Sequence, residues 1–428
     1  MRSIFTTVLL IASALPAADL PPPPGMLSIP GGSYKPLYAR ETKARSVDSF
    51  FIDVTQVTNA QFLDFVTKHP EWRRSQVKTA LADKNYLSHW AGDLDLGDDK
   101  LREAPVVHVS WFAAKAYCAS KGKRLPTQDE WEFVARADAT RPDASGDQVF
   151  LRQLLEWYSK PATSALENVH SAAKNIHGLR GLHGLVWEWV HDFNSTMVVG
   201  DSRGDGSLER QLFCGAGSLL AADVSNYAAF MRYAFRSSLK GDYCVGSLGF
   251  RGAKSVKEAP PAPSTPQFTT IYDLPGEWRT QDDQPFKLDQ LRGKPRIITM
   301  GFTSCKFACP RIIDDMKRIE RKLGADADKV GLVFFSFDTA ADNPAQMKKA
   351  AGEQKLELGR WTFAISDDET IRQLAVALQF KFATVEGFLT HSNLIAVLDT
   401  DGNIVHREET LGADIGPTVE AVLRQLKP

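Results

Sequence analysis

A proline-rich segment near the middle of the chain limits how large each folded unit can be. Residues 254–266 read KSVKEAPPAPSTP and show no hydrophobic periodicity, which is typical of an extended linker between domains. In a chain of 428 residues, this segment separates residues 25–253 from residues 267–428. Each part is long enough to bury its own hydrophobic core. We therefore predict two domains joined by a linker.

The first residues predict export. Arg2 supplies a positive charge, Ile4 to Ile11 form a short apolar run, and small residues follow up to Ala18. This order is typical of a signal peptide, which we place at residues 1–18, so the expected location is the periplasm. The apolar run is too short to cross a bilayer, and no later stretch reaches the roughly 18 apolar residues that a spanning helix needs. We expect no transmembrane segment in the mature chain.

The charge balance argues against one class of partner. The chain carries 51 Lys and Arg against 52 Asp and Glu, which gives a net charge of −1. A protein whose main partner is nucleic acid usually presents a strongly basic face. We therefore expect no nucleic-acid partner.

Hydrophobic periodicity in the second domain predicts an α/β fold. Short continuous apolar runs are typical of buried strands, and apolar residues at helical spacing predict amphipathic helices between them. An Asp-Gly turn predicts a β-hairpin near the end of the chain. The expected elements are strands over 295–302 and 330–337, helices over 312–323, 343–353 and 417–427, and a hairpin over 392–398 and 403–407. This order is typical of a thioredoxin-like fold.

Cys305 and Cys309 form the segment with the most specific chemistry. They lie between a predicted strand and a predicted helix, and Pro310 suits the first turn of that helix. The helix N-terminus carries partial positive charge, so we expect the pKa values of these thiols to be lowered. A spacing of four residues lets both sulfurs face one ligand. Two thiolates make a soft site that selects Cu(I), with zinc as a competitor.

A third ligand is expected from a distant part of the same domain. One imidazole completes a three-coordinate site with two thiolates. His391 is the leading candidate because it immediately precedes the predicted hairpin, from which its ring can reach back over the start of the helix. His406 lies after the turn and is the weaker candidate. The alternative for His391 is an ordinary packing or hydrogen-bonding role.

Two longer segments contain these three residues. They are GKPRIITMGFTSCKFACP at 294–310 and LTHSNLIAVLDTDGNIV at 389–405. Both are similar to segments of the Sco/SenC family of copper chaperones, in which a C-x-x-x-C-P motif follows a strand of a thioredoxin-like fold. The resemblance covers nearly all of residues 267–428.

The resemblance implies a cargo and a partner. It implies that Cys305, Cys309 and His391 bind copper, as Cu(I) or Cu(II), and deliver it to a client copper protein. An oxidase and a nitrite or nitrous oxide reductase are the candidate clients. Residues 334–347 resemble the Asp-containing loop of the family, which makes Asp338 a candidate partner contact.

Thiol–disulfide exchange is the alternative to copper delivery. Cys305 and Cys309 can reduce the cysteines of a client copper site through a mixed disulfide. The usual redox motif has two residues between its cysteines, whereas this chain has three, which favours metal binding. A purely structural disulfide between the two is the third alternative.

The composition of the first domain predicts only an irregular α+β fold, with helices over 59–67 and 112–121. More specific segments are APVVHVSWFAAKAYCASKGKRLPTQDEWEFVAR at 104–136, GLRGLHGLVWEWVHDF at 178–193 and SLGFRGA at 247–253. They resemble the formylglycine-generating-enzyme-like, or sulfatase-modifying-factor, family, which implies a C-type-lectin-like fold. Residues 228–251 are most similar to its NirV-type subgroup.

The catalytic residues of that family do not carry over. The two copper-binding cysteines of the active oxidase fall on Ala221 and Asn226, and neither side chain supplies a thiolate. The family's calcium-binding Asn falls on Leu185, and Glu188 alone makes a poor site, since calcium takes six or more oxygens. We therefore expect neither formylglycine synthesis nor calcium binding, and we interpret this part as a non-catalytic recognition domain.

The other cysteines have separate interpretations. Five cysteines in an exported chain leave at least one thiol unpaired, metal-bound or shared with a partner. Cys214 and Cys244 can pair as a disulfide in an oxidising compartment. Such a disulfide, or two buried thiols, is favoured over a second metal or redox site. Cys118 lies in an apolar helical pattern and is expected to be a buried core thiol.

Overall fold

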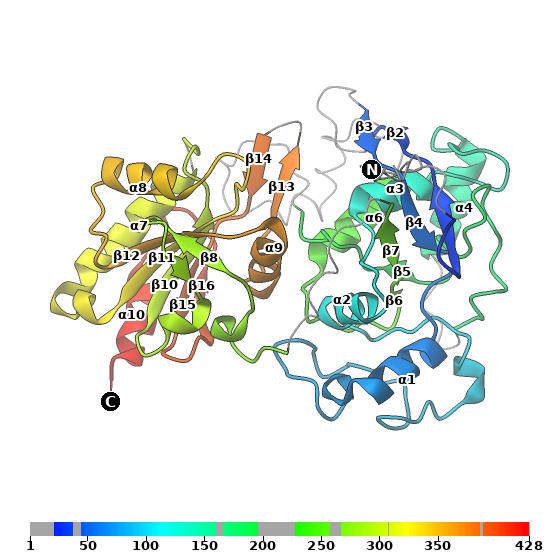
Figure 1. Ribbon diagram of the computed structural model, residues 1–428, viewed down its shortest axis with the longest axis horizontal. Helices are drawn as coiled ribbons and strands as arrows, with labels where there is room; N and C mark the ends of the chain where they lie inside the picture. The colour runs from blue at the N-terminus through cyan, green and yellow to red at the C-terminus, as the bar shows by residue number, and fades with distance from the viewer. Residues whose placement is uncertain are drawn as a thin grey trace, which may run out of the picture.

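The computed structural model describes residues 21–36, 44–159, 166–195, 227–256, 267–306, 308–385 and 388–427. These residues form two units that lie side by side (Figure 1). The predicted signal peptide and most of the predicted linker lie outside the described residues, so export stays a prediction. Within these ranges, no helix combines the length and the apolar character that crossing a bilayer requires.

The first domain is an irregular α+β unit of short elements. Strand β4 is the central strand of a three-stranded antiparallel sheet, and two further pairs of short strands lie beside it. The elements are β1 Met26–Ile29, β2 Gly32–Tyr34, β3 Arg45–Val47, β4 Phe50–Asp53, α1 Asn59–Lys68, α2 Trp111–Ser120, α3 Gln128–Ala135, α4 Gln148–Ser159, β5 Trp187–Glu188, α6 Tyr227–Ser238, β6 Leu248–Gly249 and β7 Ala253–Ser255. Helices α1 and α3 each begin at a capping box, which satisfies their first amide groups. The two helices predicted here are confirmed as α1 and α2.

A buried ion pair lies at the centre of the first domain. Arg251 Nη2 lies 2.8 Å from Glu188 Oε1, and both side chains are 0% exposed. The same carboxylate accepts hydrogen bonds from the Gln56 amide at 2.7 Å and the Trp131 indole at 2.8 Å. Glu188 therefore joins four segments that are distant in sequence. Its neighbour Trp189 is also 0% exposed, so that ring belongs to the core of the domain.

The second domain has the predicted thioredoxin-like architecture, a mixed sheet covered by helices. The sheet has the order β16-β15-β10-β11-β12-β8-β9, with β10, β11 and β12 parallel at its centre. Its elements are β8 Trp278–Thr280, β9 Pro285–Phe286, β10 Arg296–Gly301, α7 Ala308–Leu323, β11 Gly331–Ser336, α8 Pro344–Glu353, β12 Trp361–Ile365, α9 Asp368–Ala377, β13 Phe382–Val385, β14 Phe388–His391, β15 Ile395–Leu398, β16 Ile404–Glu408 and α10 Gly416–Gln425. Helix α7 buries Ile312, Met316 and Ile319 against the sheet, as its periodicity predicts.

Two differences from the predicted elements affect the site. Helix α7 begins at Ala308 rather than at residue 312, so Cys309 lies within its first turn. His391 does not lead into the strand of the predicted hairpin. It ends β14, which pairs with β13 in a separate two-stranded hairpin, and the next strand begins at Ile395. The β13–β14 hairpin was missed because its strands are short and show no long apolar run.

Candidate metal centre

The structure brings Cys305, Cys309 and His391 together beyond the carboxyl end of β10. One ligand atom from each residue lies within 4.8 Å of the others, and Cys309 Sγ lies 3.8 Å from His391 Nε2. Bonds of about 2.0–2.3 Å from an ion to nitrogen and sulfur place the ligands of a trigonal site about 3.5–4 Å apart. Small side-chain movements would therefore let the three ligands share one ion. Among the described residues, this is the one cluster of three or more His, Cys, Asp or Glu side chains with that spacing.

The backbone around the strand end holds the two sulfurs on the same side of the loop. The Cys309 amide donates to Cys305 Sγ at 3.4 Å, and the Phe302 amide donates to Cys309 Sγ at 3.5 Å. Gly301 leaves the space that Cys309 needs. A Cβ atom at this position would lie 2.8 Å from Cys309 Sγ and 2.6 Å from Phe334 Cζ, so a larger residue would displace the thiol.

The two thiols differ in exposure. Cys309 is 3% exposed, whereas Cys305 is partly exposed at the rim of the site. The pKa of Cys309 is raised well above its usual value, because its hydrogen bond with the Cys305 side chain and its burial both disfavour the thiolate. The lowered pKa predicted from the helix N-terminus is therefore wrong for Cys309. A metal ion has to displace the proton of this thiol when it binds.

His391 is held in one orientation by its own loop. Its Nδ1 lies 2.7 Å from the Ser392 carbonyl oxygen. A carbonyl only accepts, so Nδ1 donates to it, and Nε2 is the ring nitrogen that faces Cys309. Three aromatic rings surround the imidazole: Phe302 at 5.7 Å, Phe337 at 5.3 Å and Phe380, stacked on it, at 5.8 Å between centroids. These contacts align the ring and keep water from its faces.

Asp342 supports the cysteine loop and was missed in the sequence. It is 7% exposed and accepts hydrogen bonds from the Thr303 amide at 2.9 Å, the Ser336 hydroxyl at 2.5 Å and the Thr303 hydroxyl. It therefore ties the loop before Cys305 to the end of β11. Asp342 lies in the same segment as Asp338, but nothing in the neighbouring sequence shows which of the two aspartates supports the cysteine loop.

Asp338, the candidate partner contact, has an internal role in the structure. It is 8% exposed, and its carboxylate accepts a hydrogen bond from the Ala341 amide at 3.1 Å. This bond shapes the loop that also carries Asp342. A contact between Asp338 and a partner stays a prediction.

The two described cysteines of the first domain, Cys118 and Cys244, lie outside this centre. Cys118 is 0% exposed, so the predicted core thiol is confirmed. Cys244 is also buried, and its Sγ donates to the Asp242 carbonyl at 3.4 Å. Cys214 lies outside the described residues, as do Ala221 and Asn226. A disulfide between Cys214 and Cys244 therefore stays a prediction.

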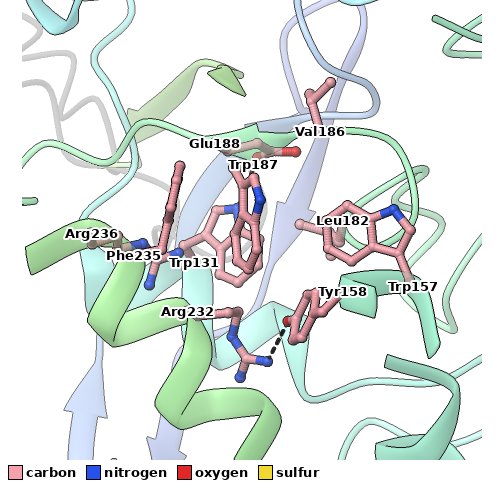
Figure 2. Close-up of a pocket in the computed structure, with 10 residues that line it drawn as sticks. All are labelled: Trp131, Trp157, Tyr158, Leu182, Val186, Trp187, Glu188, Arg232, Phe235 and Arg236. Atoms are coloured by element: carbon pink, nitrogen blue, oxygen red, sulfur yellow. Dashed lines mark hydrogen bonds between the residues drawn. The ribbon is translucent and has the colours of Figure 1, made fainter. Parts of the chain in front are cut away.

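The first domain contains a pocket with different chemistry. Figure 2 shows that aromatic side chains line it together with Arg232 and Arg236 from α6. Both guanidinium groups bind the buried Glu132, at 2.7 and 2.6 Å. The Trp187 ring packs on Phe235 at 4.6 Å. The described lining includes no thiol, so cysteine chemistry at this pocket has no support among the described residues.

Comparison with known proteins assigns both domains. Residues 12–256 match the family described as sulfatase-modifying factor enzyme 1-like domain, and residues 266–423 match SCO1/SenC. The chain belongs to the first family and carries a SCO1/SenC domain after it. The predicted fold class is therefore confirmed: a sulfatase-modifying-factor domain of irregular α+β structure precedes a thioredoxin-like domain.

Individual relatives match one domain each. A formylglycine-generating enzyme of Streptomyces coelicolor is 32% identical over 306 residues, which cover 58% of this chain and 96% of that protein. A Stutzerimonas stutzeri protein provisionally named as copper-binding is 30% identical over 130 residues, which cover 29% of this chain and 62% of that protein. The copper-bound structure of Bradyrhizobium japonicum ScoI is 26% identical, covers 36% of this chain and 96% of its own, and superposes with a TM-score of 0.30.

Proposed function

We propose that this protein binds one copper ion through Cys305, Cys309 and His391 and delivers it to a client copper protein. The observation that carries the proposal is the convergence of two sulfurs and one imidazole nitrogen within 4.8 Å. Sulfur ligands favour Cu(I) over harder ions, and the phenylalanine rings shield the faces of the His391 imidazole. The SCO1/SenC match of residues 266–423 supports the same cargo.

The difference in exposure suggests how copper leaves the site. Cys305 is the partly exposed ligand, while Cys309 and His391 are 3% and 9% exposed. A ligand of the client reaches the ion from the side of Cys305, so exchange starts with that sulfur. Cys309 and His391 hold the ion until the client supplies further ligands.

Replacing His391 with alanine tests the ligand set. The reduced, full-length chain is titrated with Cu(I) without oxygen in competition with a chromophoric chelator, and one equivalent is expected to bind. His391→Ala should weaken this binding by more than about 100-fold, because loss of a ligand exceeds the 10–100-fold cost of changing groups around one. His406→Ala is the matched control, since that ring contacts the Thr418 hydroxyl at 3.0 Å. No copper bound by the wild-type chain would reject the proposal.

Thiol–disulfide exchange is the second candidate function, and the unequal exposure of the thiols favours it. The Cys305 thiolate would attack a client disulfide, form a mixed disulfide and release one client thiol. Cys309 would then attack Cys305, so the client leaves as a dithiol and this chain as a disulfide. A Cys309→Ser variant should accumulate the mixed disulfide at Cys305, detected by mass spectrometry. If His391→Ala loses copper binding but still reduces the client disulfide, this activity is independent of copper delivery.

The first domain is proposed to recognise the client without catalysing a reaction. Neither Ala221 nor Asn226 supplies the thiolate expected of the active oxidase. A linked domain that binds the client raises the effective concentration of the copper site near its target. The client class, an oxidase or a nitrite or nitrous oxide reductase, and the periplasmic location are parts of this proposal.

A further inference from the structure

The hairpin that carries His391 has little support from its own sheet. Strands β13 and β14 pair with each other, in the register Phe382↔His391, and are not part of the seven-stranded sheet. A two-stranded hairpin is only marginally stable by itself. The position of the His391 ring therefore depends on what the hairpin packs against.

Asn194 of the first domain binds the base of this hairpin. Its side-chain amide donates to the Phe380 carbonyl at 3.0 Å, and its backbone carbonyl accepts from the Phe382 amide at 3.3 Å. Its Oδ1 accepts a third hydrogen bond, from Arg372 Nη1 at 2.8 Å. Asn194 is 5% exposed, so these bonds are shielded from water. One first-domain residue thus holds the backbone on both sides of Lys381.

The held backbone is directly connected to the imidazole. The Phe380 ring stacks on His391 at 5.8 Å between centroids. The Lys381 amide donates to the Ser392 hydroxyl at 3.0 Å, and the Ser392 amide donates to the Lys381 carbonyl at 2.9 Å. Ser392 in turn provides the carbonyl that orients His391 Nδ1. A shift at Phe380 and Phe382 would therefore move both the ring that stacks on the imidazole and the carbonyl that orients it.

Further contacts hold the two domains together beside the hairpin. Figure 1 shows α9 and the β13–β14 hairpin on the side of the second domain that faces the first. Lys115 forms an ion pair with Glu369 of α9, and the Lys115 side chain is 6% exposed. The Gly241 backbone lies against Val376, and a Cβ there would approach Val376 Cγ1 to 2.4 Å. The domains therefore meet in a packed interface rather than through Asn194 alone.

We propose that Asn194 is a positioning residue for the metal centre, and that the docked first domain holds the His391 hairpin in the conformation that binds copper. This inference rests on the proposed copper function. It assigns the first domain a role within this chain in addition to client recognition. Without the contact, the hairpin would sample other positions and Nε2 would leave the sulfurs.

The test compares full-length Asn194→Ala with a matched control. Asn175→Ala removes a first-domain amide that donates to the Val134 carbonyl at 3.2 Å, away from the interface. Three readouts are used: Cu(I) affinity, the electron paramagnetic resonance spectrum of the Cu(II)-loaded protein, and amide hydrogen exchange of the hairpin without copper. Asn194→Ala should weaken Cu(I) binding about tenfold, as changes around metal ligands do. It should also shift the copper hyperfine coupling and speed exchange over 382–385 and 388–391.

The outcomes separate this inference from the proposed function. A wild-type chain that binds no copper would reject the function, and the inference with it. If the wild type binds copper and Asn194→Ala matches Asn175→Ala in affinity and spectrum, only the inference is overturned, whether or not hairpin exchange changes. Should Asn194→Ala fail to fold, Gly241→Ala replaces it, because the added methyl pushes the domains apart at Val376. The same loss of affinity is then expected, and an unchanged copper site overturns the inference.

Discussion

Replacing Cys309 with serine is expected to remove tight Cu(I) binding while the protein stays folded. Cys309 is one of two soft ligands and is 3% exposed, and a hydroxyl is a hard, poor ligand for Cu(I). The loss should exceed the 10–100-fold effect typical of changes around a metal site. Serine is close in size to cysteine, but Cys309 Sγ already lies 3.8 Å from His391 Nε2, too far for a hydroxyl to donate, so the free energy of unfolding should fall by about 1–3 kcal/mol. Chelator competition and thermal unfolding measure the two effects.

The matched control for this prediction is another buried cysteine. Cys118 is 0% exposed and lies in α2 of the first domain. Cys118→Ser should keep one equivalent of tightly bound copper, so a general effect of losing a thiol can be told from the loss of a ligand. A Cys309→Ser protein that still binds one copper at wild-type affinity would show that the ion is held elsewhere.

Glu188→Ala is expected to lower the free energy of unfolding of the first domain by about 3–5 kcal/mol. The change leaves the Arg251 guanidinium buried without its counter-ion, and this is the typical cost of breaking a fully buried pair. It also removes the acceptor used by Gln56 and Trp131. Domains are usually stable by about 5–15 kcal/mol, so the loss should appear as a large downward shift in the urea midpoint.

Two comparisons make the Glu188 prediction specific. Glu420 pairs with Arg424 on the surface of α10, with side chains 68% and 62% exposed, and Glu420→Ala should change the stability little. Replacing both buried partners, as Glu188→Leu with Arg251→Met, should recover part of the loss because no uncompensated charge remains. If Glu188→Ala lowers the free energy of unfolding no more than Glu420→Ala does, the buried pair does not stabilise the domain.

In this chain, the first domain supplies contacts that hold part of the metal centre in the second domain. The His391 hairpin lies outside the main sheet, and its base is held by Asn194 from the other domain. The position of the His391 ring therefore depends on contacts from both domains. The difference in Cu(I) affinity between the wild type and Asn194→Ala gives the contribution of this contact to copper binding.

Local patterns in the sequence were enough to predict several strands and helices and the division into two domains. The apolar runs predicted β10 and β11, the helical spacing predicted the body of α7, and the proline-rich segment predicted two domains. These features are recoverable because strand and helix periodicity and linker composition are properties of neighbouring residues. The same holds for the pair Cys305 and Cys309, which are four residues apart at the start of α7 and so bring their sulfurs close together.

The sequence already indicated His391 as the third ligand, but the tertiary structure alone decided how that residue is held in place. Nothing near His391 in the sequence shows that it ends a separate hairpin, or that Asn194 holds that hairpin. The raised pKa of Cys309 likewise comes from burial and from the neighbouring thiol, which outweigh the helix N-terminus. Such contacts join residues that are far apart in the chain. They depend on how the elements and domains pack, so no local pattern in the sequence indicates them.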